Sequence, residues 1–193
     1  DALWRLRELR AEADVTLLVG DVTDVSSLLR AIGTAQPSEV YNLAAQSFVD
    51  KSWDLPSVTV QTTGMAVLNL LEAMRATGVG RIVFSSTCAT YGVPEAVPIG
   101  EDHPQRPINP YGESKLFIER TLHWNAVAHG LHWMALRYFN AAGADPDGEI
   151  GEDHDPESHL IPLLFRAVQG GGAVPVFGND YPTPDGTCVR DYV

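Results

Sequence analysis

The sequence predicts an α/β fold with a doubly wound parallel sheet. Short apolar runs alternate along the chain with segments of helical periodicity, and each run is apolar throughout instead of alternating with polar residues. Strands of that kind are typical of a parallel sheet that helices cover on both faces. Ligands of such sheets bind beyond the carboxyl ends of the strands.

The expected elements follow one another in a regular order. Leucines share one side of a helix at 2–12, and the apolar run 15–19 ends in Gly20-Asp21, as a buried strand does. Pro37 and Gly78 stop two further helices, because proline disfavours a helical residue before it and glycine ends helices readily. The remaining expected strands are 40–45, 81–86 and 131–139, and the remaining expected helices are 26–35, 56–76, 111–128 and 159–168.

A loop rich in Gly, Asp and Glu at 140–158 interrupts the alternation. A long polar loop inside a compact domain is often functional. We therefore expect two parts, 1–139 and 140–193, with the loop in the second part covering a substrate.

The composition excludes several kinds of partner. The 193 residues carry a formal net charge of −12, contain only two lysines and have no basic run, which argues against nucleic acid and anionic membranes. Phosphorylated small molecules stay possible, because helix N-termini and single arginines can bind phosphate. No membrane-spanning run and no signal peptide is evident. Cys88 and Cys188 lack metal-ligand spacing, so we expect no metal and a cytoplasmic location.

Tyr111 and Lys115 are the most informative residues of the chain. Four positions apart on a helix, they lie on one face, one turn from each other. An ammonium beside a phenol favours the phenolate and makes tyrosine a usable acid/base. With only two lysines in the chain, this spacing is rarely met by chance.

Several motifs then occur in one order: FSSTCATYG at 84–92, YGESK at 111–115, LRYFNAAGA at 136–144, FGNDYPT at 177–183 and VRDY at 189–192. From about residue 80 onward the chain resembles the UDP-glucose (UDP-galactose) 4-epimerases of the extended short-chain dehydrogenase/reductase superfamily. The stretch VYNLAAQSFV at 40–49 is more similar to the GDP-mannose 4,6-dehydratases of the same superfamily, which leaves the nucleotide sugar open.

The resemblance implies a Rossmann-like NAD-binding domain in 1–139 and part of a nucleotide-sugar-binding region in 140–193. It implies C4 epimerisation of a UDP-sugar through a transient 4-keto intermediate, in a homodimer. Tyr111 would take the proton of the C4 hydroxyl, directly or through Thr87, as hydride passes to NAD. Lys115 would lower the tyrosine pKa and hold the nicotinamide ribose.

Matching positions extend the expected site. The cofactor-binding residues implied by the resemblance are Asp21, Val22, Leu43, Ala44, Ala45, Ser47, Thr63, Tyr111, Lys115, Tyr138 and Phe139. The implied substrate-binding residues are Thr87, Asn140, His159, Leu160, Val176, Phe177 and Arg190. Ser47 and Thr63 replace a common lysine and asparagine, and His159 replaces a common asparagine. Asp21 has a structural alternative as a helix cap, and Arg190 has one as an ion pair with Asp191.

The glycine-rich turn that holds the NAD pyrophosphate in this superfamily does not occur in the sequence. We expect the chain to begin beyond the first strand and to stop before the rest of the substrate region, so that residues 1–193 alone bind NAD weakly and are inactive. Two alternatives remain: a nucleotide-sugar 4,6-dehydratase and a non-catalytic fragment. Dehydratases of this superfamily carry a carboxylate two residues after the threonine, where this chain has Ala89.

Overall fold

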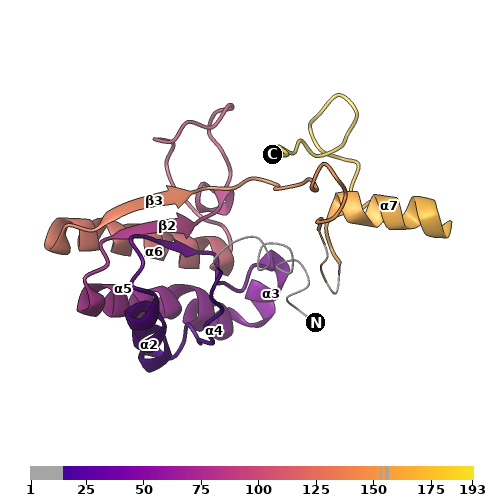
Figure 1. Cartoon of the computed structure of the whole chain (residues 1–193). Coiled ribbons are helices and arrows are strands. Elements are labelled where there is room, and N and C mark those ends of the chain that lie inside the picture. The colour runs from indigo at the N-terminus through magenta and orange to yellow at the C-terminus, as the bar shows by residue number, and fades with distance from the viewer. Residues whose placement is uncertain (1–14, 153, 155–156) are drawn as a thin grey trace. The chain divides into compact units, whose positions relative to one another are not determined.

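A computed structural model describes residues 15–152, 154 and 157–193. The chain divides into two compact units, one ending at Tyr138 and the other running from Phe139 to Val193. The predicted helix 2–12 lies outside the described residues. Figure 1 shows both units, with the sheet in the first and α7 in the second.

The first unit contains a three-stranded parallel sheet in the order β1-β2-β3. Val40 pairs with Ile82, and Ile82 pairs in turn with Trp133. Its elements are α2 (Val25–Ala35), β1 (Val40–Asn42), α3 (Val49–Asp54), α4 (Pro56–Thr59), η2 (Val60–Met65), α5 (Ala66–Thr77), β2 (Arg81–Ser85), η3 (Cys88–Thr90), α6 (Pro110–His129) and β3 (His132–Leu136). The predicted α/β fold with a parallel sheet is confirmed.

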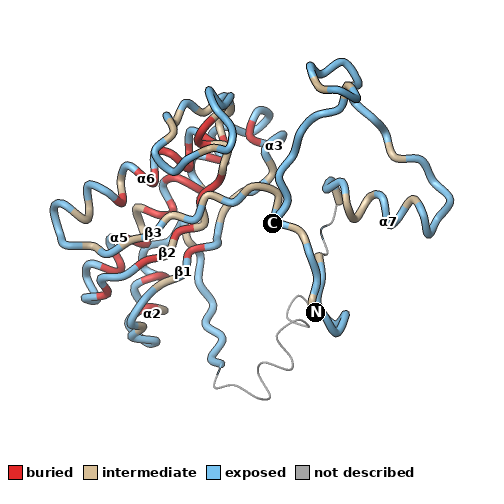
Figure 2. The backbone as a smooth tube through the Cα atoms, turned by 90° about the horizontal axis from the view of Figure 1, so that it is seen from above, coloured by how far each residue is buried: buried red, intermediate tan, exposed pale blue. Residues whose placement is uncertain are grey.

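The core lies between the sheet and the helices on one of its faces (Figure 2). Phe84 and Ile82 of β2 are 0% and 2% exposed and pack with Met74 of α5 and Leu122 of α6. Residues on the other face of the sheet are open, and Met134 is 59% exposed. Within the described residues, the helices that form the core therefore lie on one face of this sheet.

One predicted strand is absent from its place. Residues 15–20 have no strand structure and are exposed, Val19 fully so. A strand needs a neighbour for its backbone N–H and C=O groups. Among the described residues, β1 pairs with β2 alone, and no strand accompanies the 15–19 run.

The predicted helix 56–76 is divided into three parts. α4 passes into the six-residue π-helix η2, and α5 continues from Ala66 until Gly78, in the left-handed conformation, ends it. Gly64 of η2 lies against the ring of Phe117 in α6, where a Cβ would be 3.7 Å from the ring. The wider turn thus occurs where another helix packs closely, which the periodicity of one segment cannot predict.

The described residues of the second unit include the helix α7 (Leu160–Gly170), which starts after His159 and ends at Gly171 in the left-handed conformation. None of the residues of α7 is buried. An isolated bridge between Asn140 and Tyr192 joins the beginning of the unit to its end. A second bridge pairs Ala144 with Gly151.

Candidate active site

The start of α6 is fixed by local chemistry. Asn109 caps the helix, its Oδ1 accepting the backbone N–H of Gly112 at 2.7 Å, and Pro110 takes the first helical position. Gly112 lies against the loop after β2, and a Cβ there would be 2.6 Å from the carbonyl oxygen of Ala89. The absence of a side chain at 112 therefore allows the helix and the loop to meet.

This contact brings Thr87 to Tyr111. Thr87 leaves the carboxyl end of β2 and caps η3, its Oγ1 accepting the backbone N–H of Ala89 at 3.1 Å. Thr87 lies close enough to the Tyr111 phenol to lower its pKa through a hydrogen-bond interaction, and each residue is 8% exposed. The two hydroxyl groups expected to exchange a proton with a sugar hydroxyl are thus adjacent.

Lys115 completes the group from the next turn of α6. Its Nζ donates to the carbonyl oxygen of Ser85, the last residue of β2, at 2.7 Å and lies 5.7 Å from the centroid of the Tyr111 ring. The residue is 2% exposed, and this burial lowers the pKa of the ammonium to about 8.

The pKa of Tyr111 differs from the expectation. Burial raises the pKa of the phenol, and the hydrogen bond from Thr87 offsets this only in part. In this structure the expected lowering by Lys115 is therefore wrong. The ammonium is directed to the carbonyl of Ser85, and desolvation of the phenolate is the largest cause of the shift in the Tyr111 pKa.

A buried ionic network lies beside the site. Its central residue, Glu119, is two turns of α6 after Tyr111. The Glu119 carboxylate is 4% exposed and accepts hydrogen bonds from Ser86 Oγ at 2.5 Å, Arg137 Nη2 at 2.7 Å and Gln105 Nε2 at 2.9 Å. Burial alone would raise the pKa of Glu119, but these bonds, with Arg137 first, lower it below its usual value. Arg137 also donates to Tyr91 Oη at 2.8 Å.

This network was not predicted from the sequence. One signal was present, because Glu119 follows Lys115 by four positions and so shares its helix face. Ser86 directly precedes Thr87, so the network holds the segment after β2 that carries the candidate catalytic hydroxyl. Its partners, Gln105 and Arg137, come from separate segments that only the fold brings together.

Several of the expected cofactor residues follow β1, and Tyr138 and Phe139 follow β3. Leu43, at the carboxyl end of β1, is 73% exposed, and Ala44 and Ser47 are exposed as well. Thr63 is 1% exposed, and its Oγ1 accepts the backbone N–H of Gln46 at 3.2 Å, which holds the segment after β1. Tyr138 is 40% exposed beyond β3. Phe139 belongs to the other unit.

Asp21 forms a local turn with Thr23, whereas Asp24 is the residue that caps α2. Its Oδ1 accepts the backbone N–H and the Oγ1–H of Thr23 at 2.8 and 2.7 Å, bonds that lower the pKa of Asp21. Val22 is half-buried against the core. A role of either residue in cofactor binding stays a prediction.

The carboxyl ends of β1 and β2 present groups that fit a ligand with several hydroxyls. Asn42 Oδ1, at the end of β1, is buried and has no hydrogen-bond partner, so it can accept from such a ligand. Tyr111 and Lys115 lie at the end of β2. These groups suit the ribose and nicotinamide end of NAD.

The expected substrate residues fall mostly in the second unit. Asn140 Nδ2 donates to the carbonyl oxygen of Asp191 at 2.7 Å, which brings Asn140 close to Arg190. The Arg190 guanidinium is exposed and donates to the carbonyl of Val189 at 3.1 Å. Among the others, Leu160, Val176 and Phe177 are 50%, 79% and 96% exposed, and the half-exposed His159 has its Nδ1 2.8 Å from Glu157 Oε1. Their substrate roles stay predictions.

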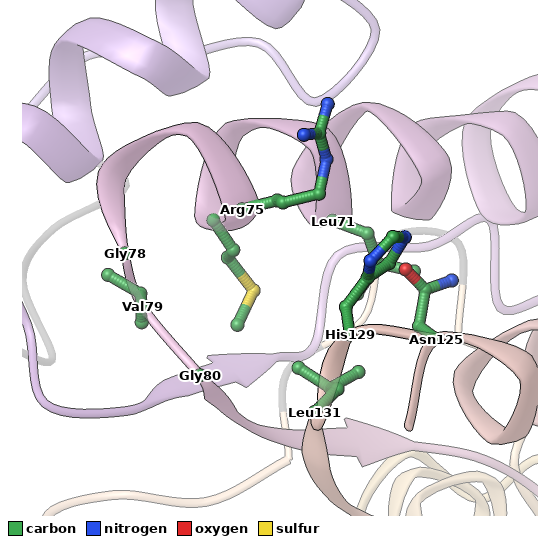
Figure 3. A pocket seen from close by; sticks show the side chains of 9 residues that line it. Leu71, Arg75, Gly78, Val79, Gly80, Asn125, His129 and Leu131 are labelled. Atoms are coloured by element: carbon green, nitrogen blue, oxygen red, sulfur yellow. The ribbon is translucent and has the colours of Figure 1, made fainter. Parts of the chain in front are cut away.

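A separate pocket lies at the opposite ends of the strands. Gly80 and Leu131, which precede β2 and β3, line it together with Met74, Arg75 and His129 (Figure 3). Because it opens at the amino ends of the strands, it is distinct from the group at Tyr111. No described helix is long and apolar enough to cross a membrane.

The chain is similar to known proteins over most of its length. The family model described as GDP-mannose 4,6 dehydratase matches residues 1–193. A UDP-glucose 4-epimerase of Lacticaseibacillus casei is 48% identical over 175 residues, 90% of this chain and 53% of that protein. A second, from Streptococcus mutans, is 52% identical over 155 residues, 80% of this chain and 46% of that protein.

Solved structures agree with this similarity. The UDP-glucose 4-epimerase from Brucella ovis in complex with NAD has a TM-score of 0.87 and 47% identity, covering 91% of this chain and 55% of that one. The enzyme from Bifidobacterium longum with NAD+ and UDP has a TM-score of 0.90 and 36% identity, covering 96% and 57%. The chain spans about half the length of the curated relatives it matches.

Proposed function

We propose that the complete protein inverts C4 of a UDP-sugar with NAD as cofactor. The chain belongs to the family described as GDP-mannose 4,6 dehydratase. The relatives compared above are UDP-glucose 4-epimerases. The substrate is of the UDP-glucose and UDP-galactose type. The single observation that carries the proposal is the grouping of Thr87 and Tyr111 with Lys115, all three buried, at the end of β2.

The residues of the site suit the proton transfers of this reaction. Bound NAD supplies the hydride acceptor for C4 and returns the hydride to the other face of the 4-keto sugar. Tyr111 takes the proton of the C4 hydroxyl, and Thr87 connects that hydroxyl to the phenol. Because both groups are almost fully buried, water competes little for the proton. Lys115 binds ribose hydroxyls. Its positive charge also stabilises the phenolate that forms when Tyr111 ionises.

The dehydratase alternative lacks an acid at the required place. Ala89 stands two residues after Thr87, and its backbone N–H is directed to Thr87 Oγ1. A methyl group cannot protonate a leaving C6 hydroxyl, which favours epimerisation over loss of water. The similarity to UDP-glucose 4-epimerases supports the same choice.

The test uses the complete enzyme. UDP-glucose and UDP-galactose are each incubated with it and with NAD, and the products are separated by chromatography. We expect each sugar to form the other, with no net reduction of NAD. A 4-keto-6-deoxy product would replace this proposal with the dehydratase. Absence of any product together with absence of NAD binding would favour a non-catalytic protein. The homodimer and the cytoplasmic location stay predictions.

A further inference from the structure

Four side chains with metal-ligating atoms gather in the loop that leads into α7. They are Glu152, His154, Glu157 and His159, and one ligating atom from each lies within 4.8 Å of all the others. The rings of His154 and His159 are 4.6 Å apart between centroids. The cluster belongs entirely to the second unit and shares no residue with the Thr87, Tyr111 and Lys115 group.

The spacing of the atoms matches one small coordination shell. Glu152 Oε1 lies 3.3 Å from His154 Nδ1 and 3.0 Å from His159 Nδ1. The Glu157 oxygens lie 3.8 Å from His154 Nδ1 and 2.8 Å from His159 Nδ1. Four ligands placed tetrahedrally at about 2.0–2.1 Å from a metal are about 3.3–3.4 Å from one another. The observed separations lie on both sides of that value.

Glu157 gives an independent indication of a ligand. Its Oε1 accepts the backbone N–H groups of Ser158 and His159, the two residues that precede α7, at 2.8 Å each. Its Oε2 is buried without a hydrogen-bond partner, on a side chain that is 0% exposed.

A buried carboxylate oxygen in that position is costly unless a cation or donor faces it. Oε2 is directed toward His154 Nδ1, across the 3.8 Å that separates the two atoms. A metal ion between the two carboxylates and the two imidazoles would satisfy this oxygen and neutralise the pair of negative charges. Hydrogen bonding within the cluster leaves Oε2 unsatisfied.

We propose that Glu152, His154, Glu157 and His159 bind a divalent transition-metal ion, with Zn²⁺ as the ion that suits them. Two imidazoles and two carboxylates in a tetrahedral arrangement are zinc ligands, and sites with four protein ligands are structural rather than catalytic. The ion joins the earlier ligands of the loop to His159, the residue that directly precedes α7. The site therefore stabilises the segment that precedes α7 and takes no part in the proton transfer at Tyr111.

The experiment uses the complete protein after removal of metal with a chelator and dialysis. Co²⁺ is titrated first, because its visible absorption reports coordination geometry, and Zn²⁺ is then added to displace it. We expect one equivalent of Co²⁺ with the intense bands of a tetrahedral site, loss of those bands with Zn²⁺, and a higher melting temperature in the presence of Zn²⁺.

Two variants each remove one ligand, Glu157→Gln and His154→Ala. We expect each to weaken Co²⁺ binding by about tenfold or more, since loss of even an outer-shell partner has effects of that size. His132→Ala, an exposed histidine of β3, is the matched control and keeps full binding. Because Glu157 also accepts two backbone N–H groups just before α7, His154→Ala separates loss of metal binding from loss of those bonds.

Equal Co²⁺ binding by the unaltered protein and both ligand variants would overturn the proposal. So would a weak octahedral spectrum, or no binding at all by correctly folded protein. In those cases the cluster is a hydrogen-bonded network of histidines and carboxylates only. None of these outcomes depends on epimerase activity, so failure here leaves the proposed function untouched.

Discussion

Gly112 lies so close to Ala89 that an added Cβ would come within 2.6 Å of the Ala89 carbonyl oxygen. The two residues belong to α6 and to the loop that follows β2, which carry Tyr111 and Thr87. The distance between these two backbones therefore sets the distance between the two hydroxyl groups. A residue with no side chain controls the geometry of the candidate active site.

Gly112→Ala should lower the activity of the complete enzyme by about tenfold or more. The methyl group must push α6 away from rigid backbone, and chemistry that depends on placement falls steeply with small displacements. Steady-state epimerisation rates and thermal unfolding of the variant measure this. Gly33→Ala is the control, because a Cβ on Gly33 in α2 meets nothing within 4 Å. It should stabilise the protein by roughly 0.5–1 kcal/mol without changing the rate.

Tyr111→Phe should remove nearly all turnover while the fold stays intact. The change deletes one hydroxyl and little packing volume, and loss of a general acid/base typically costs about 10²–10⁴ in rate. Activity and circular dichroism are measured together. Tyr41→Phe, which removes the hydroxyl of a residue that is 61% exposed, is the control and should be fully active. Unchanged turnover in a folded Tyr111→Phe protein would disprove the assignment.

Lys115→Met should abolish activity and should also remove a pH-dependent contribution to the free energy of unfolding. The folded pKa of Lys115, about 8, lies below the ordinary value of 10.5, so the unfolded chain binds more protons between these values. The free energy of unfolding of the unaltered protein should therefore rise with pH in this window, by roughly 3 kcal/mol at most.

In Lys115→Met this rise should be absent, which unfolding in denaturant at pH 7 to 10.5 can determine. Lys51→Met is the control, because Lys51 is exposed and is the only other lysine of the chain. It should keep the rise. The same rise in Lys115→Met would mean that another group is responsible.

Glu119→Leu should destabilise the protein by about 3–5 kcal/mol, because it leaves the Arg137 guanidinium and the Ser86 hydroxyl without their shared partner. Since the folded pKa of Glu119 is lowered, its contribution is present above the unfolded pKa and is lost as the pH falls through the folded value. Unfolding experiments at neutral and acidic pH test both points.

The exposed pair Glu72 and Arg75, at 2.6 Å, supplies the comparison. Glu72→Gln should cost no more than about 0.5 kcal/mol, because exposed ion pairs contribute little. If the two substitutions had equal effects, the buried network would have no special role in the stability of the site.

The sequence by itself determined much of the first unit. Apolar runs and helical periodicity predicted β1, β2, β3 and the helices α2, α5 and α6, because these signals are local to each segment. The spacing of Tyr111 and Lys115 predicted their common helix face. Pro37 and Gly78 marked the ends of α2 and α5 correctly, since each acts through its own backbone.

Tertiary structure alone decided the rest. The burial that raises the Tyr111 pKa, the network around Glu119 and the cluster before α7 all depend on segments that the sequence does not show to be neighbours. Residues 15–19 read as a strand, but a strand exists only where a partner satisfies its hydrogen bonds. Local pattern fixes which conformation a segment prefers, whereas burial and pairing are properties of the surroundings that the folded chain provides.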